Sequence, residues 1–272
     1  MECKLENITV FYEQFGEGRP VIMLHGWPVD HRHMVKDFEP LFQAHPGWKR
    51  IYPDMPGMGR TPGEAWIHNQ DLMLGVLLDF IDALIPGQQF AVAGTSYGGY
   101  LARGLVHQRT SDISGVMLMT PAMTMDDKKN LPQHVTLVKD EALLTSLDPE
   151  EASFFKEFAV VQSAELLDSL RSDIYPAFEV ADHAFLEKMR GSRNFTFDID
   201  MLPEPFDKPA LFLLGRQDAT TGYAEAWKIL EDYPRATFAV LDRAGHGLGA
   251  EQKQLFETLT NEWLNRVEES VE

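Results

Sequence analysis

The sequence has very little cysteine and no long apolar run. Its 272 residues include one cysteine, Cys3, which excludes an intramolecular disulfide and fits a reducing compartment. No apolar stretch approaches the roughly 18 residues that a transmembrane helix needs. The N-terminus also lacks the basic-then-apolar pattern of a secretion signal. These absences predict a cytoplasmic protein that does not use a membrane as its partner.

Positive charge is also scarce, because 42 Asp plus Glu stand against 24 Lys plus Arg, for a formal net charge of −18. That surplus repels nucleic acids and anionic membrane surfaces, so neither is expected as a partner. With 44% hydrophobic residues, the chain can bury a sizeable core. No feature of the sequence sets the oligomeric state.

Strand-like apolar runs alternate with helical patterns from about residue 20 to 120. Val21–Leu24 and Ile113–Met119 are as continuously apolar as buried parallel strands are. Between them, His68–Ile85 carries apolar residues at helical spacing. This alternation predicts an α/β fold with a mostly parallel central sheet and helices on both faces. Ligands of such folds bind at the carboxyl ends of the strands.

A Gly-x-Ser-x-Gly motif, residues 94–98, stands between the apolar run Phe90–Thr95 and a helical pattern. Ser96 would then occupy a sharp, strained turn with its hydroxyl exposed above the sheet. The amides at the start of the following helix favour a nearby oxyanion. The alternative is a strand-to-helix turn that is merely rich in glycine and serine.

This motif resembles the nucleophile elbow of the α/β-hydrolase superfamily, and the resemblance covers most of the chain. It implies the α/β-hydrolase fold and a catalytic triad in the order nucleophile, acid, base. Asp218, after the strand-like Pro209–Leu214, holds the acid's place, and His246, on a glycine-flanked loop, matches the general base. Asp242 is a rival acid, but it is too close in sequence to His246 to face it easily.

The same resemblance implies an oxyanion hole. His25-Gly26 begins the oxyanion loop of the family, so the backbone N–H groups of Trp27 and Tyr97 are the expected donors. We expect His25 to brace this loop rather than to catalyse. Asp54 begins an Asp-x-x-Gly-x-Gly loop and is expected to accept loop amides, a structural role.

No metal or cofactor is expected. His31 and His33 are two residues apart at an expected helix start, a spacing that suits one face of a strand better than a helix. Hydrolysis through an acyl-serine, the chemistry that the resemblance implies, needs neither a metal nor an organic cofactor.

From about residue 123 to 203 the alternation gives way to helical patterns. The expected helical segments are Leu131–Lys139, Glu141–Leu147, Pro149–Val161, Ala164–Arg171 and Ala181–Arg190. Members of the resembling family often carry a helical cap after the sixth strand. We therefore expect residues 1–122 and 204–272 to form the core domain and residues 123–203 an inserted cap. Aromatic side chains of the cap could line a pocket or join cap to core, and the sequence leaves both open.

The serine nucleophile argues against haloalkane dehalogenase and epoxide hydrolase chemistry, for which the family uses a carboxylate. The resemblance implies a small-molecule serine hydrolase that cleaves an ester, amide or C–C bond through an acyl-enzyme. One alternative is a ligand-sensing or signalling protein of the same fold, with slow turnover or none. Another is an aminopeptidase like the proline iminopeptidases, although the loop reads His-Gly-Trp-Pro rather than His-Gly-Gly-Pro-Gly.

Overall fold

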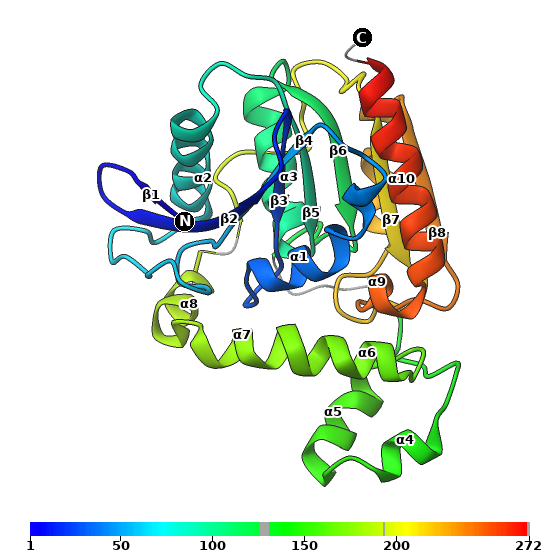
Figure 1. The fold of residues 1–272 in the computed structure, drawn as a ribbon. Helices are drawn as coiled ribbons and strands as arrows, with labels where there is room; N and C mark the ends of the chain where they lie inside the picture. Colours follow the sequence, from blue (N-terminus) through cyan, green and yellow to red (C-terminus); the bar gives the residue numbers. More distant parts are fainter. Residues whose placement is uncertain (126–130, 193, 271–272) are drawn as a thin grey trace.

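A computed structural model describes residues 1–125, 131–192 and 194–270 and has one central sheet between two layers of helices (Figure 1). The sheet order is β1-β2-β4-β3-β5-β6-β7-β8. The strands are β1 (Glu2–Lys4), β2 (Thr9–Phe15), β3 (Arg19–Leu24), β4 (Trp48–Pro53), β5 (Phe90–Thr95), β6 (Ile113–Met119), β7 (Ala210–Gly215) and β8 (Ala236–Leu241). In the described part of the chain, only the pairs β1–β2 and β2–β4 are antiparallel, and the other neighbouring strands of the sheet run parallel. The mostly parallel sheet is therefore confirmed.

Helices cover both faces of this sheet (Figure 1). The α-helices are α1 (His31–Phe38), α2 (Gln70–Leu84), α3 (Tyr97–Arg109), α4 (Glu141–Thr145), α5 (Pro149–Phe158), α6 (Ala164–Ser169), α7 (Tyr175–Val180), α8 (His183–Met189), α9 (Leu248–Glu251) and α10 (Lys253–Ser270). Three further helices are η1 (Leu41–Gln43) and η3 (Glu225–Asp232), both 3-10, and η2 (Leu170–Ile174), a π-helix. No helix in the described part of the chain is both long and apolar enough to cross a membrane.

The buried strands divide their side chains between two cores. On β3, Ile22 and Leu24 pack with α2 and α3, whereas Val21 and Met23 pack with α1 and α10. The same alternation continues through β5, β6 and β7. It follows from the two-residue period of a strand. Because both faces are covered, these strands are apolar throughout, which is the pattern that predicted them.

Helices α4 to α8 come between β6 and β7 in the chain and lie beyond the carboxyl ends of the strands (Figure 1). Part of them shares a small core of its own, which includes Phe155, Leu166 and Leu170. The division into a core domain and a cap at residues 123–203 stays a prediction. Residues 126–130 and 193 of that expected cap lie outside the described residues.

Two expectations for this region are wrong in detail. The stretch Leu131–Lys139 is not a helix; the Leu137 and Val138 N–H groups donate to the Val160 carbonyl, and Val138 bridges Val161. Pro132 lacks an N–H group, and β-branched residues follow it, so extended pairing wins over helix. The expected helix Ala164–Arg171 also ends too early, because η2 continues from α6 without a break and leads directly into α7.

Candidate active site

Ser96 joins β5 to α3 in a conformation that residues other than glycine rarely adopt, with φ 53° and ψ −116°. Three backbone hydrogen bonds hold it there: its N–H donates to Met119, and its carbonyl accepts from Tyr100 and Ala122. The surrounding structure thus over-determines a strained residue, which is how such strain persists at functional sites. The Ser96 hydroxyl makes no capping hydrogen bond to α3, so it is free to contact a ligand.

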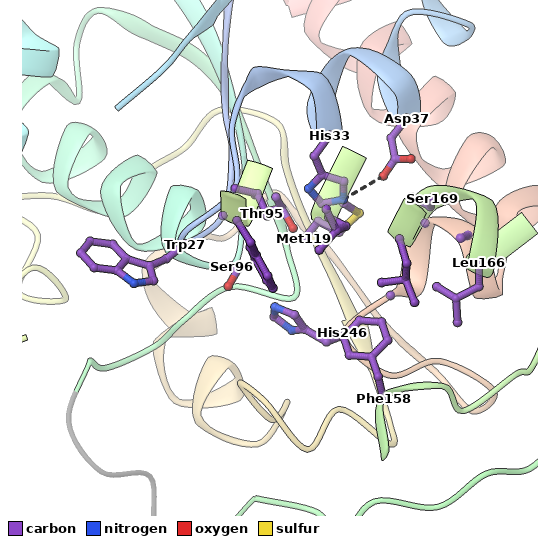
Figure 2. A pocket seen from close by; sticks show the side chains of 18 of the residues that line it. Trp27, His33, Asp37, Thr95, Ser96, Met119, Phe158, Leu166, Ser169 and His246 are labelled. Atoms are coloured by element: carbon purple, nitrogen blue, oxygen red, sulfur yellow. Dashed lines mark ion pairs between the residues drawn. The ribbon is translucent and has the colours of Figure 1, made fainter. Parts of the chain in front are cut away.

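The structure brings His246 to Asp218. The Nδ1 atom of His246 lies 3.0 Å from Oδ2 of Asp218, whose side chain is fully buried. An ionised carboxylate only accepts, so Nδ1 is the donor, and in the neutral imidazole this tautomer leaves Nε2 as the acceptor. Figure 2 shows the side chains of His246 and Ser96 pointing toward one another. The rival acid Asp242 is exposed and makes no such contact.

The carboxylate of Asp218 uses its two oxygens differently. Oδ1 accepts from the N–H groups of Thr220 and Thr221 at 2.8 and 2.9 Å, whereas Oδ2 faces His246 and the Thr221 hydroxyl. Burial by itself raises the pKa of Asp218, but His246 and the Thr221 hydrogen bonds outweigh it and leave the pKa below its usual value. Asp218 therefore remains ionised at neutral pH.

The expected oxyanion loop lies against the elbow. A Cβ atom built on Gly26 would lie 3.3 Å from Cβ of Ser96, so the loop passes directly beside that residue. Among the described residues, neither the Trp27 nor the Tyr97 N–H group donates a hydrogen bond to another part of the chain. Two backbone donors next to Ser96 are therefore left without a partner among the residues that the structure describes.

His25 braces this loop, as expected. Its Nε2 accepts from the Met55 N–H group at 3.0 Å, so Nδ1 carries the proton and donates to the Gly26 carbonyl at 2.8 Å. Complete burial lowers the pKa of His25 even though Asp54 acts in the opposite sense. A neutral, buried imidazole thus ties the end of β3 to the loop after β4.

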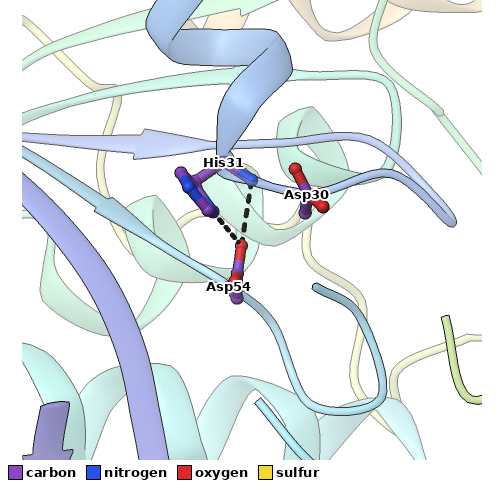
Figure 3. Close-up of side chains that lie close together, drawn as sticks. All are labelled: Asp30, His31 and Asp54. Atoms are coloured by element: carbon purple, nitrogen blue, oxygen red, sulfur yellow. Dashed lines mark hydrogen bonds and ion pairs between the residues drawn. The ribbon is translucent and has the colours of Figure 1, made fainter. Parts of the chain in front are cut away.

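Asp54 also has the structural role expected of it (Figure 3). Its Oδ1 accepts from the N–H group and from Nδ1 of His31, at 2.9 and 2.7 Å, and its Oδ2 accepts from the Arg60 N–H group at 2.8 Å. Asp30, His31 and Asp54 could in principle offer ligand atoms to one metal ion. However, Asp30 already caps α1 and pairs with Arg32, so the protein itself satisfies these oxygens.

Ser96 and His246 line one cavity of about 110 Å³ (Figure 2). Such a volume exceeds the roughly 10–15 Å³ that one water molecule requires, so the cavity has room for a small organic group. Most of its lining is apolar and comes from β6, α5, α6, η2 and α9. The apolar lining residues include Val29, Met119, Phe154, Phe158, Leu166, Leu170, Ile174, Phe178 and Ala250. Aromatic residues of the expected cap therefore do line the pocket.

Glu251 was not anticipated, although it ties the site together. Its buried carboxylate accepts from the Gly245 N–H group at 2.6 Å, next to His246, and from the Val160 and Val161 N–H groups at 2.7 and 3.2 Å. Burial raises the pKa of Glu251, whereas these three hydrogen bonds act in the opposite sense. One side chain thus links the loop of His246 to the chain that follows α5.

The sequence is similar to a known protein family over most of its length. The model of the alpha/beta hydrolase family matches residues 21–257. A pimeloyl-[acyl-carrier protein] methyl ester esterase of Legionella pneumophila is 24% identical, with 94% of this chain and 100% of the relative covered. The non-heme chloroperoxidase CPO-A1 of Kitasatospora aureofaciens is also 24% identical, with 96% and 98% covered.

Solved structures show the same fold. An alpha/beta superfamily hydrolase from Oenococcus oeni superimposes with a TM-score of 0.88 at 26% identity, covering 98% of this chain and 99% of that one. An esterase from Exiguobacterium antarcticum superimposes with a TM-score of 0.73 at 21% identity, covering 95% and 96%.

The role of Glu251 can be tested by replacing it with its amide. Glu251→Gln turns one acceptor oxygen into a donor, which then faces a backbone N–H group in a buried place. We expect the free energy of unfolding to fall by about 1–3 kcal/mol, measured by urea denaturation. The matched control is Glu262→Gln, because Glu262 is half-exposed and forms a surface ion pair with Arg266. That control should change stability by less than about 0.5 kcal/mol, and equal losses in both variants would refute the assignment.

Proposed function

Since the chain belongs to the alpha/beta hydrolase family, we propose that it hydrolyses small carboxylic esters through an acyl intermediate on Ser96. One observation carries the proposal. The hydroxyl of a strained serine shares a cavity with an imidazole, and that imidazole is hydrogen-bonded to a buried, ionised aspartate.

In the first half of the reaction, Ser96 attacks the ester carbonyl. A free serine hydroxyl is a poor nucleophile at neutral pH, so Nε2 of His246 takes its proton as the new C–O bond forms. Asp218 holds the proton of His246 on Nδ1 and stabilises the imidazolium. The imidazolium then gives its proton to the leaving alcohol as the ester C–O bond breaks. The product of this half-reaction is an acyl-Ser96 ester.

The negative charge that develops on the carbonyl oxygen needs donors. The N–H groups of Trp27 and Tyr97, which have no partner among the described residues, are the proposed oxyanion hole. Each donor contributes about 3–4 kcal/mol to the stability of the transition state in comparable sites. Because His25 fixes the loop that carries Trp27, this donor is in place before the substrate arrives.

Water completes the cycle. His246 removes a proton from a water molecule, the hydroxide attacks the acyl carbonyl, and the returning proton releases Ser96 and a carboxylic acid. The residues 123–203 act in this scheme as a cap. Its side chains, among them Phe158 and Leu166, form part of the apolar cavity and limit the access of bulk water.

Two lines of support favour an ester over the other bonds. The relatives include methyl ester esterases over nearly the whole chain, and the cavity is mostly apolar, as suits an acyl chain. We also propose that the substrate is a small molecule and that the protein acts in the cytoplasm.

Labelling with a small fluorophosphonate tests Ser96 without knowledge of the substrate. The intact mass should increase by one adduct in the wild type and stay unchanged in Ser96→Ala. The matched control is Ser169→Ala, since Ser169 is a second serine of the same cavity and this variant should still take one adduct. An adduct that survives Ser96→Ala would show that another residue is the nucleophile. An adduct on Ser96 without turnover of any ester would favour the ligand-sensing alternative.

The acid of the triad can be tested separately. Asp218→Asn removes the charge that stabilises the imidazolium and can reverse the tautomer of His246, so kcat should fall by about 10⁴-fold. Asp242→Asn is the control, because Asp242 is the nearby exposed aspartate, and its kcat should change less than about threefold. Comparable losses of kcat in the two variants would mean that the loss is not specific to Asp218, and they would contradict its role as the triad acid.

A further inference from the structure

One wall of the cavity carries a histidine–aspartate pair that the proposed reaction does not use. His33 and Asp37 are one turn apart on α1, with Nε2 of His33 3.5 Å from Oδ2 of Asp37. Both side chains line the same cavity as Ser96 and His246. In Figure 2 the pair lies beside Met119 and on the other side of Ser96 from Trp27. The cavity therefore has one polar wall within an apolar lining.

The protein does not satisfy the hydrogen-bonding capacity of this pair. Nδ1 of His33 is buried and has no partner among the described residues. Asp37 has a side chain only 14% exposed, and its sole partner in the described part of the chain is His33. Buried polar groups are almost always hydrogen-bonded to the protein or to ordered water. A carboxylate with spare acceptors in a cavity is instead typical of a binding site.

The Asp37 carboxylate lies close to Gly249 of α9. A Cβ atom on Gly249 would come within 2.8 Å of Oδ2 of Asp37. Gly249 itself lines the cavity and follows the loop of His246 by three residues. The carboxylate thus lies against the helix that follows the loop of His246, and a side chain at position 249 would displace it.

We propose that Asp37 and His33 form a subsite that binds a hydroxyl group of the ester substrate, which makes hydroxy-substituted esters the preferred class. This inference rests on the esterase function proposed above. The hydroxyl can belong to the acyl part or to the alcohol part of the ester, since the pair and Ser96 share one continuous cavity.

The charges around Asp37 favour a hydroxyl over a charged group. Burial raises the pKa of Asp37, and Asp173 of η2 adds to the rise, whereas His33, Lys36 and Lys253 lower it. A substrate carboxylate would meet Asp37 and Asp173, and an ammonium group would lose its hydration in a mostly apolar cavity. A hydroxyl both donates and accepts, so it pairs with Asp37 whether or not that carboxyl is ionised.

The test compares pairs of esters that differ only in one terminal hydroxyl. One series consists of methyl esters of ω-hydroxyalkanoic and plain alkanoic acids, and the other of ω-hydroxyalkyl and plain alkyl acetates, each over several chain lengths. In at least one series, the wild type should prefer the hydroxylated ester by about tenfold or more in kcat/KM, the usual worth of a hydrogen bond to a charged group. The series that shows the preference identifies the part that carries the hydroxyl.

Two variants should remove that preference by different routes. Asp37→Leu deletes the acceptor, so the ratio of the two kcat/KM values should fall to about one. Gly249→Ala moves the Asp37 carboxylate by steric contact and should lower the same ratio while residue 37 stays an aspartate. The control is Glu165→Leu, which removes an exposed acidic residue of α6 outside the cavity and should leave the ratio unchanged.

A wild-type ratio near one in both series, or a preference that Asp37→Leu retains, would overturn the subsite. A stronger preference for matched ω-amino esters would also overturn it, because it would assign an ammonium ligand. Turnover of the plain esters, lost in Ser96→Ala, keeps the failure of this inference separate from failure of the esterase proposal. If neither plain nor hydroxylated esters react, the esterase proposal fails first.

Discussion

The arrangement of the site depends on how closely α3 approaches the end of β3. A Cβ atom on Gly98 would lie 2.1 Å from the Leu24 carbonyl oxygen, so only glycine permits this contact. The contact brings the first turn of α3 against the loop that follows β3. As a result, the strained Ser96, the Tyr97 N–H group and the Trp27 N–H group come from two segments far apart in sequence but lie at one edge of the sheet.

The second half of the site is held by carboxylates rather than by apolar packing. Asp218 fixes the His246 ring, and Glu251 fixes the backbone just before that ring. Glu251 also holds the chain after α5, which contributes to the wall of the cavity. The position of the imidazole and the position of the helices over the strand ends are therefore coupled through one buried side chain. Substrate contacts made by those helices can in this way affect the catalytic geometry.

Sequence reasoning succeeded where a residue type has one dominant physical cause. The apolar strands follow from burial on both faces, and the position of Ser96 follows from the glycines at Gly94 and Gly98 that a tight turn requires. It failed for Glu251 because its hydrogen-bond partners include Val160 and Val161 in a distant segment, and it failed for the His33–Asp37 pair because a spacing of four residues on a helix does not show that both side chains face a cavity. A glutamate five residues after His246, on a short helix, carries no local pattern that distinguishes it from a surface residue. The stretch 131–139 was misjudged because its pairing with residues 160–162 is a tertiary contact.

If the acyl group is transferred to Ser96 before hydrolysis, competition between water and methanol for that acyl group will reveal the shared intermediate. Esters that share one acyl group but carry different leaving alcohols would be hydrolysed in the presence of methanol. If a common acyl-enzyme forms, the ratio of methyl ester to free acid is the same for every leaving group, because the alcohol has departed before the partition. A ratio that changes with the leaving group would mean that water or methanol attacks the ester itself, and it would exclude an acyl intermediate on Ser96.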